Sequence, residues 1–238
     1  MKLDVLAIGA HPDDVEITCA GTIIKLVRTG KSVGILDLTE GELGTRGSRE
    51  ERREEAVVAA SLLGVTVREN LGLADGNIAV TRESILGLVR LLRRLRPEIL
   101  LIPYGHDRHP DHMHAHTLCR EAWFYAGLGK IDTIEEGLAQ APHRPHNFYQ
   151  FMQWYEFDPS FIVDVSETWQ LRMDSVRAFK SQFHNPASSD PQTVLSSPGF
   201  FDFIETRAKY YGNRIGAQFG EPFFLERTPG VSDLSAII

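Results

Sequence analysis

Two short stretches of the chain combine histidines with aspartates, the residue types that bind metals and move protons. Residues 11–14 read HPDD and follow the largely apolar run 3–8, and residues 106–112 read HDRHPDH and follow the apolar run 99–103. Imidazole nitrogens and carboxylate oxygens are zinc ligands, and three protein ligands leave a fourth position open for water. Zinc lowers the pKa of such a water to about 7 and polarises a substrate carbonyl. The two stretches therefore predict a hydrolytic zinc centre if the fold brings them together.

The adjacent aspartates Asp13 and Asp14 repel each other, and a cation resolves that repulsion. One aspartate can bind the metal while its neighbour takes the proton from the activated water. The alternative is that either aspartate only caps the helix that follows. For one stretch alone the two explanations are equally good. Two histidine-rich stretches at the ends of neighbouring strands favour a shared catalytic site.

The elements that must position these stretches alternate between short apolar strands and amphipathic helices. We expect strands over 3–8, 33–38, 65–70 and 99–103, and helices over 15–29, 50–63, 84–95 and 112–127. This alternation predicts a Rossmann-like α/β fold, with a mostly parallel sheet of order 3-2-1-4-5 and helices on both faces. In that order the first and fourth strands are neighbours, and ligands bind in the crevice at their carboxyl ends. Both stretches would face this crevice.

The pattern loosens after residue 127. We expect further strands over 148–154, 161–165 and 222–225, helices over 168–183 and 205–211, and a loop rich in serine and proline over 184–199. No linker-like segment separates this part from the rest. We interpret it as an elaborated C-terminal region of one domain that spans residues 1–238.

The composition limits the classes of partner. The 238 residues carry a net charge of −7, which argues against nucleic acid because phosphate binding needs clustered lysine and arginine. The basic stretch 90–96 has apolar residues at helical spacing, which favours a solvated helix face. No apolar run reaches the ~18 residues of a membrane span, and the N-terminus is unlike a signal peptide. Cys19 and Cys119 fit reduced, packed thiols, so we expect a cytoplasmic protein with no membrane partner.

The motifs also carry a family resemblance. AHPDD followed by VEITCAGTI, with RHPDH further on, is similar to the LmbE-like/PIG-L family of zinc-dependent N-acetylglucosamine deacetylases. Softer segments, among them LDLTEGELGTRGSREERREEA, ENLGLADGNI, SFIVDVS, AFKSQF and YYGNRIGAQFGEPF, resemble the bacillithiol-biosynthesis branch, which deacetylates N-acetylglucosaminyl malate. One departure is TCAGT at 18–22, where members of this branch often have a second small residue. We expect it to affect helix packing behind the site and to leave the ligands in place.

The resemblance assigns roles to the residues of both stretches. It implies that His11, Asp14 and His112 bind zinc, although iron(II) could occupy the same donors. Asp13 would be the general base that later protonates the leaving amine. His109 would carry a positive charge and stabilise the tetrahedral oxyanion.

Outside the metal ligands, Asp107 and Asp111 are suited to orient and charge His109 or a zinc-binding histidine. The resemblance implies that Arg52 contacts the sugar or its carboxylate appendage, and a bidentate contact from arginine would suit malate. The alternative for Arg52 is an i,i+4 ion pair on an exposed helix face, because this helix alternates arginine with glutamate.

Three further residues are expected near the mouth of the site because they follow other strands at the same sheet edge. Glu42 and Arg46 lie in the glycine-rich loop 41–47 after the second strand, and Asp75 follows the third. The glycine-rich loop could equally be a flexible turn. Asp75 could hold a sugar hydroxyl or only form a turn.

The leading hypothesis is therefore hydrolysis of the acetamide of N-acetylglucosaminyl malate, a small-molecule substrate. The family resemblance also implies a homo-oligomer, such as a hexamer. A second hypothesis is deacetylation of another N-acetylglucosaminyl compound, such as a chito-oligosaccharide or an antibiotic precursor. A nucleotide-binding module is disfavoured because the first turn, GAHPDD, lacks the glycine pattern that admits a pyrophosphate and places acids there instead.

Overall fold

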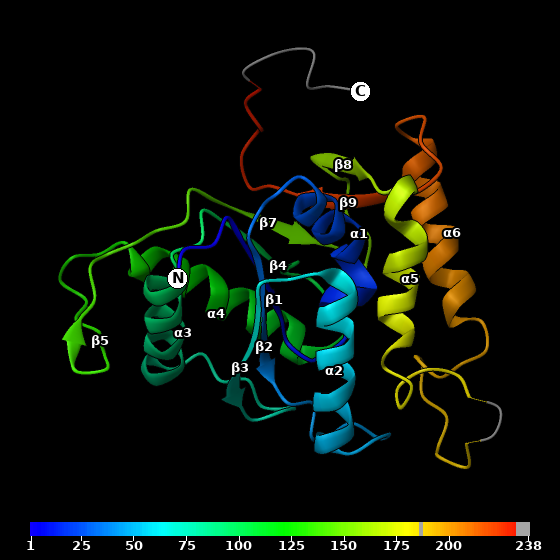
Figure 1. Cartoon of the computed structure of the whole chain (residues 1–238), viewed down its shortest axis with the longest axis horizontal. Coiled ribbons are helices and arrows are strands. Elements are labelled where there is room, and N and C mark those ends of the chain that lie inside the picture. The colour runs from blue at the N-terminus through cyan, green and yellow to red at the C-terminus, as the bar shows by residue number, and fades with distance from the viewer. Residues whose placement is uncertain (186–187, 232–238) are drawn as a thin grey trace.

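A seven-stranded sheet forms the centre of the computed structural model, which describes residues 1–185 and 188–231 (Figure 1). Its strand order is β3-β2-β1-β4-β7-β9-β8. The strands are β1 (Val5–Gly9), β2 (Val33–Thr39), β3 (Val67–Leu73), β4 (Ile99–Pro103), β7 (Asn147–Phe151), β8 (Phe161–Asp164) and β9 (Gly220–Phe224). The first five in spatial order are parallel, and two further strands extend one edge, where β9 pairs antiparallel with both β7 and β8. The predicted order 3-2-1-4-5 is confirmed, with β7 as the fifth strand.

Helices cover both faces of the sheet. They are α1 (Asp14–Arg28), α2 (Arg49–Leu63), α3 (Arg82–Leu95), α4 (Pro110–Ala126), α5 (Trp169–Arg177) and α6 (Phe200–Asn213). Side chains alternate between the faces of a strand, so Leu6 and Ile8 of β1 pack with α3 and α4, whereas Val5 and Ala7 pack with α1. Figure 1 shows α3 and α4 on the opposite side of the sheet from α2 and α5. None of the helices in the described residues is both long and apolar enough to span a membrane.

The elements of the C-terminal region differ from expectation in extent. Helix α5 ends at Arg177 rather than at 183, because the Ser181 N–H and hydroxyl both bind Glu55 instead of continuing a helix. Helix α6 begins at Phe200 rather than at 205. Aromatic residues have modest helix propensity, and burial of Phe200 in the core overrides it. A hairpin of β5 (Ile134–Glu135) and β6 (Leu138–Ala139) was not anticipated.

Helix α1 is kinked near its start, at Cys19, where φ is −138° and ψ is 16°. The kink frees the N–H groups of Gly21 and Thr22, which donate to the Glu221 carboxylate at 2.9 and 2.7 Å. Arg172 completes the arrangement, with its Nε 3.0 Å from Glu221 and its Nη2 donating to the carbonyl of residue 17. Buried backbone donors need partners, so β9 and α5 hold the first turns of α1, which carry Asp14, in place.

Candidate active site

The turn from β1 into α1 projects two adjacent aspartates toward the crevice. Gly9 is required there, because a Cβ at that position would lie 3.1 Å from the Asp14 Cβ and from the His11 carbonyl oxygen. Asp13 has a φ of 114°, a backbone region that costs energy for a residue with a side chain and that clusters at functional sites. The two neighbouring carboxylates therefore leave the backbone in different directions.

The structure brings His11, Asp14 and His112 together, with one potential ligand atom from each within 4.8 Å of the others. The His112 Nε2 atom lies 3.3 Å from Asp14 Oδ1, and the His11 Nδ1 atom lies 3.5 Å from Asp14 Oδ2. Two imidazoles and one carboxylate at this spacing match the donor set of a catalytic zinc site, which keeps a fourth position open. The three residues therefore fit a divalent metal ion.

Each histidine of this set uses its second ring nitrogen to contact a carboxylate. His112 Nδ1 lies 2.8 Å from Asp107 Oδ1, and Asp107 also accepts the Trp154 N–H at 2.7 Å. His11 Nε2 lies 3.0 Å from Asp75 and 3.5 Å from Asp111. Such contacts fix the ring orientation of metal-binding histidines and raise their basicity. Asp75, expected near the substrate, thus contacts a proposed metal ligand.

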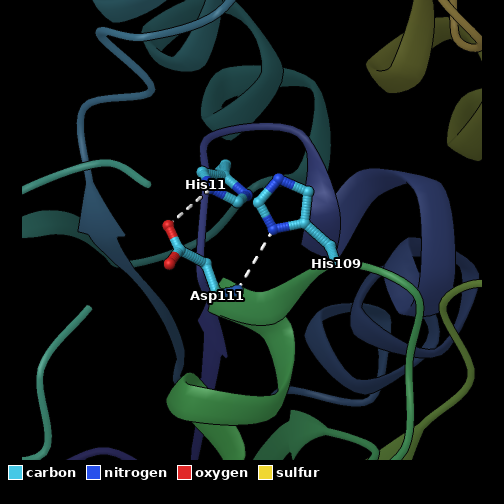
Figure 2. Close-up of side chains that lie close together, drawn as sticks. All are labelled: His11, His109 and Asp111. Carbon is cyan, nitrogen blue, oxygen red and sulfur yellow. Dashed lines mark hydrogen bonds and ion pairs between the residues drawn. The ribbon is translucent and has the colours of Figure 1, made fainter. Parts of the chain in front are cut away.

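Figure 2 shows the neighbourhood of His11, with Asp111 on one side and His109 on the other. These three residues also lie close enough to share an ion. However, the Asp111 oxygens already accept the N–H groups of Gly76 and Ile78 at 2.7 and 3.2 Å. The set that contains Asp14 is therefore the better metal site, and Asp111 orients His11.

The charges of the ligand set favour a cation. Burial opposes a charge on His11, but hydrogen bonds to Asp111, Asp14 and Asp75 raise its pKa well above the usual value. Burial likewise opposes a charge on His112, yet Asp14 and Asp107 raise its pKa to about 9. Without a metal, both imidazoles are thus protonated and surrounded by carboxylates. A metal ion that binds there must displace the extra protons.

Asp13 is buried and does not belong to the ligand set. Its Oδ2 atom lies 3.1 Å from Arg52 Nη2. Burial raises the pKa of Asp13 to about 7, with Arg52 opposing and Asp14 adding to the shift. A carboxyl group that titrates near neutral pH can both take up and return a proton. The geometry thus suits the base role expected for Asp13.

His109 lies against both metal-site histidines, with its ring centroid 4.9 Å from that of His11 and 4.8 Å from that of His112. The Asp111 N–H donates to its Nδ1 at 3.2 Å. Burial, together with the charges of His11 and His112, lowers the pKa of His109. Because Nδ1 accepts an N–H, the ring can donate from Nε2 in this arrangement, and the positive charge expected from the sequence stays a prediction.

Arg52 faces inward from α2 and is buried, unlike an exposed ion-pair residue. It pairs with Asp13 and donates to the carbonyl oxygens of Pro12 and, at 3.2 Å, Gly41. Gly41 has a φ of +67°, and a Cβ there would meet Arg52 Nη1 at 2.0 Å. The guanidinium therefore holds Asp13 and its loop, which leaves it less free to bind the substrate carboxylate for which it was expected.

The other two expected contacts do not line the cavity. Arg46 is buried, and its Nε donates to the Ser181 carbonyl at 3.0 Å. Glu42 accepts the Asp75 N–H at 3.0 Å. Both side chains therefore support loops around the site.

A cavity of about 520 Å³ opens over the proposed metal ligands. Besides the proposed metal ligands, its lining includes Arg108, Gln153, Trp154, Phe203 and Arg207. None of these five residues was predicted from the sequence. Arg108 lies within HDRHPDH, but the other four carry no spacing signal, because the segment after β7 meets α6 only in the folded chain.

The chain is similar to known proteins over most of its length. The family model described as PIG-L: GlcNAc-PI de-N-acetylase matches residues 6–123. Diacetylchitobiose deacetylase of Thermococcus kodakarensis is 33% identical over 229 residues, which cover 91% of this chain and 80% of that protein.

Two solved structures extend the likeness over nearly the whole fold. The conserved protein TT1542 of Thermus thermophilus has 35% identity and a TM-score of 0.87, with 98% of both chains covered. The N,N'-diacetylchitobiose deacetylase of Pyrococcus horikoshii has 27% identity and a TM-score of 0.79, with 94% of this chain and 82% of that chain covered. From the identity and coverage of these relatives, the chain belongs to the PIG-L family and is an N-deacetylase.

Proposed function

We propose that this protein hydrolyses the acetamide of an N-acetylglucosamine conjugate, with zinc as the metal. The proposal rests on the different surroundings of two adjacent aspartates. Asp14 joins two histidines in a metal-binding set, whereas Asp13 stays outside it as a buried carboxyl with a pKa near 7. A metal held by His11, Asp14 and His112 supplies Lewis-acid chemistry, by activating water and polarising the carbonyl.

The side chains around this site perform the remaining steps. Asp13 takes the proton from the attacking water, and the Arg52 contact keeps its carboxyl oriented. His109 donates from Nε2 to the oxygen that becomes negative as the carbonyl carbon turns tetrahedral. Asp13 then returns the proton to the amine nitrogen, the C–N bond breaks, and acetate leaves. The free amine remains on the sugar.

The substrate class follows from the relatives, two of which are named as diacetylchitobiose deacetylases. They support an N-acetylglucosamine group at the metal. For the attached group we propose malate, as in bacillithiol biosynthesis, because Arg108 and Arg207 line the same cavity as the proposed metal ligands. A chito-oligosaccharide is the second candidate, favoured by the names of these relatives.

Acetate release from three compounds tests the proposal. The zinc-loaded enzyme would receive N-acetylglucosaminyl malate, N,N'-diacetylchitobiose or free N-acetylglucosamine, and we expect the highest kcat/KM for the first. Equal values for all three would refute the malate assignment and leave a general deacetylase. No acetate from any of them would refute the proposed function. Metal analysis of each preparation would show that an inactive sample carries its ion.

A further inference from the structure

One part of the cavity wall is a continuous row of aromatic and guanidinium groups. The Arg108 Cζ atom lies 4.6 Å from the centre of the Trp154 ring. That ring lies 5.3 Å from the Phe203 ring, and the Arg207 Cζ atom lies 5.1 Å from the Phe203 ring centre. We call Arg108, Gln153, Trp154, Phe203 and Arg207 the arginine end of the cavity. Cation–π contacts of this kind hold a guanidinium without neutralising it.

Neither guanidinium of the arginine end has a carboxylate oxygen within 4.0 Å in residues 1–185 and 188–231. Three arginines whose side chains are little exposed do have one, since Arg52 pairs with Asp13, Arg68 with Asp37, and Arg172 with Glu221. Arg93, which is also buried, instead donates to three main-chain oxygens and to the Thr133 hydroxyl. Burying an unpaired charge is costly. This cost falls on Arg207, which is partly buried, because Arg108 is exposed. Both guanidinium groups line the cavity and are open to an anion from outside the chain.

Arg207 shows this cost directly. Its Nη1 donates to the main-chain oxygen of Gln153, and burial lowers its pKa to about 10. The Gln153 side chain beside it is 8% exposed, and its Oε1 atom is buried without a hydrogen-bond partner. Such unpaired polar atoms are uncommon in folded proteins and need an explanation. A bound ligand that brings a carboxylate and a hydroxyl would satisfy both residues.

We propose that the arginine end binds a carboxylate on the group attached to N-acetylglucosamine, and that Arg108 and Arg207 thereby select acidic conjugates. This inference rests on the proposed function, because the same cavity must hold the acetamide at the metal ligands. Arginine suits the task, since its planar donors match a carboxylate. A neutral sugar stacked on Trp154 is less consistent with the structure, because that ring already contacts Arg108 and Phe203.

The test compares an acidic with a neutral conjugate of similar size, N-acetylglucosaminyl malate and N,N'-diacetylchitobiose. For each variant we would measure the ratio of their kcat/KM values. Charged hydrogen bonds contribute enough that Arg108→Gln and Arg207→Gln should each lower this ratio by about 10- to 100-fold. Arg207→Lys keeps the charge but loses the planar donors, and should fall in between. Arg108 is exposed, so its variant is expected to fold even if the Arg207 variants do not.

The matched control is Arg177→Gln, which removes an arginine over an aromatic ring, Phe201, outside the cavity. It should leave the ratio within about twofold. A ratio that does not fall in Arg108→Gln or in a folded Arg207→Gln would overturn the proposal, as would an equal loss on both substrates.

Equilibrium binding by calorimetry separates this inference from the proposed function, because it needs no turnover. If neither conjugate releases acetate, the proposed function fails. Weaker binding of the malate conjugate to Arg108→Gln than to the parent enzyme would still support the arginine end as an anion subsite. Equal binding to both proteins would refute it.

Discussion

The two ends of the cavity differ in how their charges are compensated. At the metal end, Asp107, Asp111 and Asp75 each accept main-chain N–H groups and also contact a histidine. At the arginine end, two guanidinium groups have no carboxylate partner in the described chain. Groups that must keep one geometry for catalysis are held by the protein itself, as preorganised catalysis requires. The two guanidinium groups that we propose to recognise the substrate would gain a carboxylate partner only when the substrate binds.

The largest effect is expected at the metal end, from Asp13→Asn. Removing the group that accepts the proton should lower kcat by about 10²- to 10⁴-fold, the usual range for a general base. The metal content should stay the same, because Asp13 lies outside the ligand set. Acetate release and metal analysis on the same preparation measure both quantities.

Two further variants make this result interpretable. His112→Ala should lose both metal and turnover, since it removes a proposed ligand. Asp174→Asn, a substitution of an exposed aspartate on α5, should change neither. If Asp13→Asn kept more than a tenth of the parent kcat, the base role would be wrong.

The next prediction concerns Glu221 and Arg172, which hold the first turns of α1 in place. Glu221→Gln removes the charge that pairs with Arg172, and both side chains are 3% exposed. An uncompensated buried charge should lower the free energy of unfolding by about 3 kcal/mol, as measured by urea denaturation. The control is Glu205→Gln, which breaks an exposed i,i+4 pair with Lys209 and should cost under about 0.5 kcal/mol. If both variants lowered the free energy of unfolding equally, Glu221 would not be the residue that holds the kink of α1 in place.

This contrast also separates what the sequence predicts from what only the fold reveals. The strand order and the meeting of residues 11–14 with 106–112 follow from local periodicity and from the rule that parallel strands place ligands at their carboxyl ends. The arginine end does not follow, because the segment after β7, which holds Trp154, meets α6, which holds Arg207, only in the folded chain. The true partners of Arg46 and Arg52 also escaped prediction, since helical spacing alone does not show whether an arginine points inward.

A smaller effect distinguishes the two histidines of the metal end. His112 contacts one outer carboxylate, Asp107, whereas His11 contacts both Asp75 and Asp111. Asp107→Asn should therefore weaken metal binding by about 10- to 100-fold, and Asp75→Asn should weaken it less. Competition with a chelator of known affinity measures both values. The reverse order would mean that Asp75, rather than Asp111, is the main partner of His11.

The smallest effect is expected for Trp154→Leu, which links the two ends. The Trp154 main chain donates to Asp107 at the metal end, while its ring lies under Arg108 at the arginine end. The substitution removes the ring contacts with Arg108 and Phe203 but keeps the main chain, and an exposed cation–π contact contributes about 0.5–1 kcal/mol. The KM for the malate conjugate should thus rise about two- to fivefold, with kcat and metal affinity unchanged because the N–H to Asp107 remains. A fall in metal affinity would show instead that the ring fixes Asp107, and the two ends of the cavity would then be coupled.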